Sequence, residues 1–267
     1  MKHAFALHGA TGRMGRAIAA GLAEDARAAL RHAIARQDDP ELGRDAGQLA
    51  GVRALGAPVR AERELEGADA VIDFSTPEAA AEIARACAAA RVPLVTGTTG
   101  LSASQRAELE ALAERVPVVA APNMSVGVTL LFHLAEHAAK ILGAGFDAEI
   151  VEMHHRLKED APSGTAVELA RRVALGKGLD PDACAVHGRS GRVGKRPGDQ
   201  IGVMTLRGGT VIGDHQLILA GAGERVELAH YAQDRSIFAR GAVRAAHWVV
   251  GKHAGLYDMA DVLGLPK

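Results

Sequence analysis

The residues that decide the fold are 3–15, HAFALHGATGRMG, in which a short apolar run leads directly into three glycines. The run predicts a buried strand, and Gly9, Gly12 and Gly15 open the helical stretch RAIAAGLAED. A glycine-rich turn between a strand and a helix can bind a dinucleotide pyrophosphate, because the backbone approaches closely and the helix start presents free N–H groups. The spacing is GxxGxxG, so a glycine-rich turn without a ligand stays an alternative.

Outward from this turn, residues 1–125 alternate short apolar runs with alanine-rich helical stretches. The runs are RHAIAR, ADAVIDFS, VPLVTG and VPVVAAPN. This βαβ pattern predicts a parallel sheet with helices on both faces. Thr76 and Pro77 are expected as the N-cap and first residue of the helix that runs through EAAAEIARACAAA.

After residue 125 the pattern changes. An amphipathic helix, VTLLFHLAEHAAKIL, leads into strand-like runs that Gly-containing turns separate, which predicts an antiparallel or mixed sheet. The last helical stretch, IFARGAVRAAHWVVGKH, resembles the first half again. The sequence therefore predicts an α/β fold: a dinucleotide-binding domain formed by residues 1–125 and 236–267, and an inserted α+β domain, residues 126–235.

Composition excludes several classes of protein. With 48% hydrophobic and 24% charged residues, the chain of 267 residues has the balance of a globular protein. Its 31 Lys and Arg residues are spread among 32 acids, which argues against nucleic acid as the main partner. No secretory segment and no membrane span of about 18 apolar residues is evident, which predicts a cytoplasmic location without membrane contact. Cys87 and Cys184 lie far apart, so we expect buried, inert thiols.

The end of the expected second strand bears on the choice of cofactor. An NAD enzyme usually places an acid there to bind the ribose 2′-hydroxyl. Here Ala35 takes that position, and Arg36 beside it can meet a 2′-phosphate, so the sequence favours NADPH. Asp38 and Asp39 follow closely and leave NADH use open, and Arg36 as a solvated surface residue is the alternative.

Two further loops follow expected strands of the same sheet. Gly97, Thr98 and Thr99 come after VPLVT, and residues 121–125, APNMS, come after VPVVA. Ligands bind outside the carboxyl ends of parallel strands, so both loops are candidates for cofactor contact. Each is equally compatible with an ordinary turn.

Adjacent histidines stand in the segment 150–166, IVEMHHRLKEDAPSGTA. If the strand DAEIVEM continues through them, His154 and His155 project to opposite faces and have different roles. That geometry makes a poor metal pair, and no third ligand stands nearby, so we expect no metal site.

The same segment contains the groups that an anion requires. Lys158 follows, and a helix begins soon after it, where Thr165 and Glu168 fit a capping box. A lysine, one histidine and free helix N–H groups suit a carboxylate, which leaves the other histidine for proton transfer near neutral pH. A surface strand with exposed histidines and a solvated lysine is the alternative.

Four motifs in order, GATGRMG, VTGTTG, APNMSVGV and EMHHRLKEDAPSGTA, together resemble the 4-hydroxy-tetrahydrodipicolinate (dihydrodipicolinate) reductase family over nearly the full length. The resemblance implies a Rossmann-type NAD(P)H domain and a mixed-sheet domain that binds a cyclic dicarboxylate and joins subunits into a homotetramer. It also implies reduction of 4-hydroxy-tetrahydrodipicolinate to tetrahydrodipicolinate, in lysine and diaminopimelate biosynthesis. The reaction expected is hydride transfer from the nicotinamide, with NADPH preferred and NADH as the alternative.

The resemblance also implies roles for single residues. His154 matches the family's proton donor and Lys158 its second catalytic group. The substrate contacts implied are His155, Ser163, Gly164 and Thr165. The cofactor contacts implied are Gly9, Ala10, Thr11, Gly12, Arg13, Met14, Gly97, Thr98, Thr99, Ala121, Pro122, Asn123 and Met124, in addition to Arg36, which the strand-end argument predicts.

Three positions depart from the family's pattern. Ala35 stands where many members have an acid, Met124 replaces a phenylalanine, and His8 occupies a place that is usually small or apolar. Two other functions are compatible with this type of fold: a two-domain dehydrogenase that acts on an amino acid, such as an aspartate dehydrogenase, and a non-catalytic NAD(P)-sensing regulator. The His-His-x-x-Lys to Ser-Gly-Thr segment favours the reductase.

Overall fold

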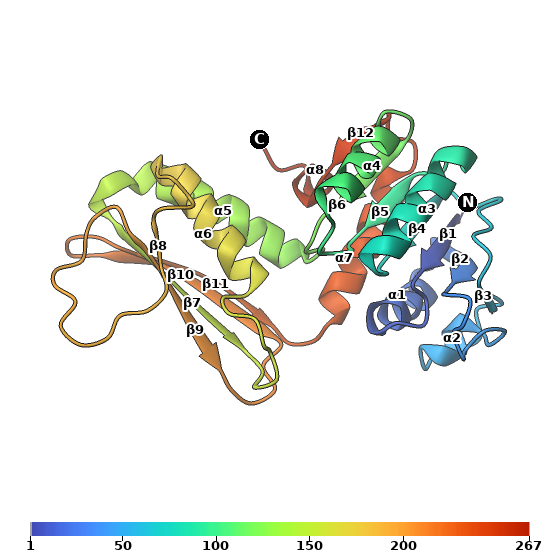
Figure 1. Ribbon diagram of the computed structural model, residues 1–267, viewed down its shortest axis with the longest axis horizontal. Helices are drawn as coiled ribbons and strands as arrows, with labels where there is room; N and C mark the ends of the chain where they lie inside the picture. The colour runs from blue at the N-terminus through green and yellow to red at the C-terminus, as the bar shows by residue number, and fades with distance from the viewer. Residues whose placement is uncertain (1, 267) are drawn as a thin grey trace. The chain divides into compact units, whose positions relative to one another are not determined.

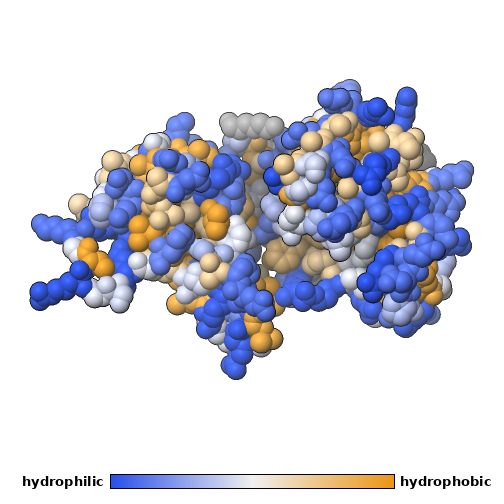
Figure 2. Space-filling view, in the orientation of Figure 1, coloured by the Kyte–Doolittle hydropathy of each residue, from blue (hydrophilic) through white to orange (hydrophobic). Residues whose placement is uncertain are grey.

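The computed structural model describes residues 2–266, which form two compact units (Figure 1). The first unit runs to Val126 and resumes at Arg235, and the second spans residues 127–234. No helix in the described residues is both long and apolar enough to cross a membrane. Figure 2 shows that hydrophilic side chains cover most of one face of each unit, with apolar residues scattered among them.

The first unit contains a parallel sheet of seven strands in the order β12-β6-β5-β4-β1-β2-β3. The predicted parallel sheet is therefore confirmed. The strands are β1 (His3–His8), β2 (Ala28–Ile34), β3 (Val59–Arg60), β4 (Ala70–Asp73), β5 (Leu94–Thr96), β6 (Pro117–Ala120) and β12 (Gly255–Tyr257).

Helices cover both faces of this sheet because successive strand residues point to opposite sides. Phe5 and Leu7 belong to the core that includes α1 and α7, whereas Ala6 belongs to the core that includes α3 and α4. Helix α3 begins as predicted, with Pro77 in its first turn and the Thr76 hydroxyl accepting a hydrogen bond from an amide. The helices of the unit are α1 (Arg13–Glu24), α2 (Ala46–Leu49), α3 (Pro77–Ala90), α4 (Ala103–Ala113), α7 (Ser236–Val249) and α8 (Met259–Leu263).

The strand order reverses between β1 and β4. The chain leaves β1 through α1 toward β2, and leaves β4 through α3 toward β5, on the other face of the sheet. The two connections diverge, so the carboxyl ends of β1 and β4 border the crevice in which open α/β sheets bind ligands. The doubly wound arrangement thus puts the glycine-rich turn after β1 at the edge where a dinucleotide is expected.

The second unit contains a mixed sheet of five strands in the order β11-β10-β7-β9-β8, as predicted. Strand β10 runs antiparallel to β7 and β11, and β9 runs parallel to β7 and β8. The strands are β7 (Asp147–His154), β8 (Ala185–Val186), β9 (Ile201–Arg207), β10 (Gly213–Ala220) and β11 (Arg225–Ala232). The helices are α5 (Val126–Leu142), the short η1 (Gly143–Gly145) and α6 (Gly164–Lys177).

The two faces of this mixed sheet differ. Helices α5 and α6 share a core with alternate strand residues such as Ile150, Val203 and Leu217. Strand register places another set of apolar side chains together on the opposite face, where Leu206 is 49% exposed and Tyr231 is 62% exposed. That set comprises Val151, Met153, Met204, Leu206, Ile218 and Tyr231.

Candidate active site

A buried carboxylate, Glu152 on β7, organises the second unit. Strand alternation puts it on the helix-covered face, and it is fully buried. Arg207 donates to its two oxygens at 2.9 and 3.0 Å, and the Ser163 amide donates at 3.0 Å. Burial opposes ionisation, but the bonds from Arg207, His154 and Ser163 outweigh it and hold the pKa of Glu152 below its ordinary value.

His154 is oriented by this carboxylate. Its Nδ1 lies 2.6 Å from Glu152 Oε2, and because an ionised carboxylate only accepts, we assign the proton to Nδ1. Nε2 is therefore the nitrogen that can exchange a proton. At Gly213, an added Cβ would lie 2.9 Å from Nε2, so the missing side chain leaves that nitrogen uncovered. A histidine held in this way suits general acid–base chemistry.

A second histidine, His215 on β10, borders the first. The two rings are edge to face with centroids 5.3 Å apart, and His215 Nε2 lies 3.0 Å from Ser163 Oγ. Burial, together with the neighbouring His154, lowers the pKa of His215 to about 4. His215 is therefore neutral near pH 7 and puts no second positive charge beside His154.

The start of α6 differs from the prediction. Ser163 is the N-cap, and its hydroxyl accepts a hydrogen bond from the Ala166 amide at 3.2 Å. The helix therefore begins at Gly164, and the predicted capping box of Thr165 and Glu168 is wrong. Glu168 instead forms ion pairs within the helix. The physical reason is that the serine two residues earlier already satisfies the first-turn amide.

Strand β7 ends at His154, so the premise that the strand continues through His155 is wrong, and the separate roles of the two histidines stay a prediction. His155 lies beyond the strand, half-buried, with a buried Nδ1 that has no partner within residues 2–266. Lys158 lies 2.7 and 2.8 Å from the carboxylate oxygens of Asp160. The cation expected to meet an anionic ligand therefore already has a carboxylate partner, with which a ligand would compete.

The glycine-rich turn of the first unit has the geometry that its sequence requires. Gly9 has a φ of 77°, and an added Cβ there would lie 2.5 Å from the Phe74 carbonyl oxygen. At Gly15 an added Cβ would lie 2.1 Å from the Gly9 carbonyl oxygen, so the turn and helix pack closely. Helix α1 begins after Gly12 without a side-chain cap, which leaves its first-turn N–H groups available to a phosphate.

The segment after β2 contains Arg36, the expected contact to a 2′-phosphate, and Asp39, an alternative contact to a 2′-hydroxyl. Arg36 is 71% exposed and pairs with Asp38 at 3.2 Å. Asp39 accepts a hydrogen bond from the Thr11 hydroxyl at 2.7 Å. Burial opposes its charge, but this bond and one from the Glu41 amide help to keep the pKa of Asp39 below its ordinary value. An exposed guanidinium and a carboxylate tied to the glycine-rich turn thus follow the same strand.

The other predicted cofactor loops differ in what they expose. The Thr98 hydroxyl donates to Asp73 at 2.8 Å, while Thr99 is exposed. After β6, Pro122 is exposed, but the Met124 side chain is 1% exposed and packs in the core of the unit. Contact between Met124 and a cofactor would therefore use its backbone.

Sequence reasoning missed three residues of the site, namely Glu152, Arg207 and His215. Glu152 could have been predicted from the sequence, because a residue two positions before His154 lies on the same face of the strand. Arg207 and His215 reach the site only through the register of β9 and β10 with β7. No cluster of three or more potential metal ligands occurs in the described residues.

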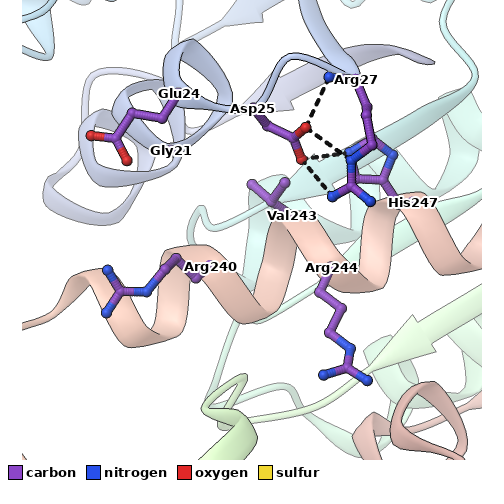
Figure 3. A pocket seen from close by; sticks show the side chains of 8 residues that line it. All are labelled: Gly21, Glu24, Asp25, Arg27, Arg240, Val243, Arg244 and His247. Atoms are coloured by element: carbon purple, nitrogen blue, oxygen red, sulfur yellow. Dashed lines mark hydrogen bonds and ion pairs between the residues drawn. The ribbon is translucent and has the colours of Figure 1, made fainter. Parts of the chain in front are cut away.

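A cavity of about 450 Å³ in the first unit contains none of the predicted site residues (Figure 3). It lies between the end of α1 and α7 and is lined by Arg240 and Arg244, which are exposed. On its other side Asp25 pairs with Arg27 at 2.9 Å and with His247 at 3.0 Å. Arg27 is exposed, whereas Asp25 and His247 are largely buried, and none of the three was predicted to contact the cofactor.

A doubly wound sheet with an uncapped glycine-rich helix start, together with a separate unit in which a buried carboxylate orients a histidine, is typical of two-domain nicotinamide-dependent oxidoreductases. The family description "Dihydrodipicolinate reductase, N-terminus" matches residues 4–124, and "Dihydrodipicolinate reductase, C-terminus" matches residues 127–263. The chain belongs to the dihydrodipicolinate reductase family, as its motifs indicated.

Individual relatives agree with this assignment. The chain is 53% identical over 262 residues to the 4-hydroxy-tetrahydrodipicolinate reductase of Thiobacillus denitrificans, covering 97% of this chain and 98% of the relative. It is 50% identical to the reductase of the same name from Anaeromyxobacter dehalogenans, with 96% of each chain covered. Among solved structures, the dipicolinate-bound dihydrodipicolinate reductase from Paenisporosarcina sp. TG-14 matches with a TM-score of 0.79 and 27% identity, over 98% of this chain and 99% of that one. An amine dehydrogenase from Mycobacterium smegmatis, at 17% identity and a TM-score of 0.61, shares the fold alone.

Proposed function

We propose that this chain reduces 4-hydroxy-tetrahydrodipicolinate to tetrahydrodipicolinate in lysine and diaminopimelate biosynthesis, with His154 as the proton donor. The observation that carries the assignment of roles is the buried Glu152, which lies 2.6 Å from His154 Nδ1 and leaves Nε2 as the exchanging nitrogen. A nicotinamide cofactor, when bound, would supply a hydride for the substrate ring. The protein's own task is then to deliver a proton and to stabilise the negative charge that hydride addition places on the ring.

Each residue of the second unit has a part in that task. Nε2 of His154 donates the proton, and Glu152 stabilises the imidazolium form before transfer. Lys158 offers a positive charge to the substrate, in competition with its bond to Asp160. His155, Ser163, Gly164 and Thr165 contact a substrate carboxylate, because the start of α6 favours negative charge.

The first unit holds the cofactor in this proposal. The free N–H groups at the start of α1 bind the pyrophosphate, and the predicted loops at residues 97–99 and 121–124 complete the site. The exposed guanidinium of Arg36 favours the 2′-phosphate of NADPH, and Asp39 offers a weaker route to NADH.

A spectrophotometric assay tests the proposal. Substrate generated in place by the upstream synthase should cause NADPH oxidation, which depends on both the synthase and this chain. A His154→Gln variant should lower kcat by about 10²- to 10⁴-fold while NADPH binding persists, because only the proton donor is removed. An active His154→Gln variant would exclude His154 as the donor, and no oxidation by the wild type would exclude the reaction.

We further propose that the chain forms a homotetramer through the second unit. The set of apolar side chains given above, from Val151 to Tyr231, belongs to strands β7, β9, β10 and β11 and lies opposite to the helix-covered face. Charged residues such as Glu149 and Glu227 share this opposite face with it. Partly exposed apolar surface of this kind is typical of subunit interfaces. Light scattering should report about four times 27.7 kDa, and a stable monomer at micromolar concentration would contradict the proposal.

A cytoplasmic location completes the proposal. Cys87 and Cys184 are both free and buried, which suits a reducing compartment. Cell fractionation should recover the chain with cytosolic marker enzymes, and recovery with the membrane fraction would contradict this location.

A further inference from the structure

A polar row crosses the sheet of the first unit at the carboxyl ends of its strands. Strand register aligns Ile34, His8, Asp73, Thr96 and Ala120, the last residues of five neighbouring strands. Aligned residues of parallel strands point to the same side, here the face that α3 and α4 cover. The three central members are polar, and two of them, from β1 and β4, border the crevice where the strand order reverses.

Asp73 is the centre of this row and is fully buried. Its carboxylate accepts hydrogen bonds from Ser75 Oγ at 2.6 Å, Thr96 Oγ1 at 2.7 Å and Thr98 Oγ1 at 2.8 Å. His8 Nδ1 lies 2.8 Å away. Burial opposes the charge, but the bonds from His8, Ser75 and Thr96 outweigh it, so the pKa of Asp73 lies below its ordinary value. The carboxylate is therefore ionised near neutral pH.

These bonds connect three loops at the edge of the sheet. His8 directly precedes the glycine-rich turn, Ser75 belongs to the connection from β4 to α3, and Thr98 belongs to the loop after β5. Thr98 is held twice more: its hydroxyl accepts from the Ser75 amide at 3.2 Å, and its amide donates to Thr96 Oγ1 at 3.3 Å. One anion thus fixes the first and last of these loops to the same point.

Packing at Phe74 reinforces the same spacing. An added Cβ at Gly9 would lie 2.5 Å from the Phe74 carbonyl oxygen, and one at Gly97 would lie 2.3 Å from the Phe74 ring. The Phe74 amide also donates to the His8 carbonyl oxygen at 3.2 Å. Phe74 therefore fills the space between the two glycines, and neither loop can approach or retreat without disturbing residues 73–75.

We infer that Asp73 is a positioning residue for the nicotinamide cofactor, which sets the spacing between the glycine-rich turn and the Thr98 loop, with His8 as its partner on β1. The inference rests on the proposed function, in which both loops bind the cofactor. It also gives His8 a role, since a small or apolar residue there would leave one carboxylate oxygen of a buried anion with fewer donors. Loss of this network should weaken cofactor binding and leave proton transfer intact, because the proton donor belongs to the second unit.

The test measures NADPH affinity by the fluorescence of the bound nucleotide, together with kcat and KM. In Asp73→Asn the Kd and KM for NADPH should rise about tenfold to a hundredfold, by analogy with residues that orient the ligands of a metal ion. His8→Ala should show a smaller rise of the same kind. In both, kcat at saturating NADPH should stay near the wild-type value, as expected when only uniform binding is lost.

Asp45→Asn is the matched control. Asp45 is a carboxylate of the same unit that accepts four backbone amides, from Gly47, Gln48, Leu55 and Ala57, and touches neither cofactor loop. The Asp45→Asn variant should lower Tm without changing the Kd for NADPH. The comparison therefore distinguishes a specific effect on cofactor binding from a general loss of stability.

Wild-type affinity for NADPH in both Asp73→Asn and His8→Ala would overturn the inference. If Asp73→Asn does not fold, Thr96→Val removes one donor and keeps the charge, and its Kd must rise measurably or the inference is again overturned. A wild-type chain that binds neither NADPH nor NADH would instead refute the proposed function, so the two failures are distinguishable.

Discussion

Replacing Glu152 with glutamine tests the central geometry of the second unit. The carboxylate accepts from Arg207, the Ser163 amide and Thr205 as well as from His154. A glutamine of the same shape has one acceptor oxygen and an N–H₂ group that faces donors. The variant therefore leaves Arg207 without a countercharge and removes the acceptor that fixes the proton on His154 Nδ1.

Two magnitudes follow from this environment. Breaking a buried ion pair costs about 3–5 kcal/mol, and because Arg207 is 20% exposed we expect a loss of unfolding free energy near the lower end, about 3 kcal/mol. A misoriented His154 loses much of the 10²- to 10⁴-fold benefit of a positioned acid, so kcat should fall by about 10²-fold or more. The Kd for NADPH should not change.

The assay compares Glu152→Gln with Glu149→Gln in steady-state NADPH oxidation, below the Tm of both variants. Glu149 is three residues earlier on β7, on the opposite face, and pairs with Arg189 and Arg196 at 2.9 Å each. The Glu149→Gln variant therefore removes comparable ion pairs but changes no contact of His154. Equal kcat in the two variants would refute the argument that Glu152 orients the proton donor.

Three further predictions follow from single contacts. Arg36→Ala should raise KM for NADPH by about tenfold and leave KM for NADH unchanged, since one charge-assisted contact is lost. Arg240→Ala, which replaces an exposed arginine on α7, is the control, and an equal rise of KM in both variants would contradict the prediction. Gly213→Ala should lower kcat by about 10- to 100-fold with normal NADPH binding, because its methyl group would lie 2.9 Å from His154 Nε2. Gly198→Ala, which has open space around it, is the control and should leave kcat unchanged. In urea unfolding, the wild-type free energy of unfolding should rise between about pH 4 and 6.5, with at most about 3 kcal/mol from His215, because the ring stays neutral when folded and is protonated when unfolded. A His215→Gln variant whose unfolding free energy rises equally over this pH range would contradict the prediction.

Much of the fold was predictable because its determinants are local. The glycine-rich turn, the Thr76 cap and the strand runs each depend on residues within one element, and the structure reproduces them. The start of α6 was missed by two residues because Ser163 and Thr165 are both good N-caps, and only the three-dimensional path of the chain decides between them. The end of β7 was missed for the same reason, since sequence alternation does not say where pairing with β9 stops.

The chemistry of the candidate site was only partly predictable, and the carboxylates that sequence reasoning missed share one feature: each is buried on a strand. Glu152 and Asp73 are both carboxylates in the buried phase of a strand, where an isolated charge would be prohibitively unfavourable. Such a residue survives only if donors converge on it, and here they come from 55 positions away for Arg207 and 65 positions away for His8. A charged residue in the apolar phase of a strand therefore predicts a convergence of distant segments, although it does not name them. Within residues 2–266 each unit contains one such buried carboxylate. Glu152 contacts His154, the proposed proton donor, and Asp73 contacts His8, which precedes the proposed cofactor turn.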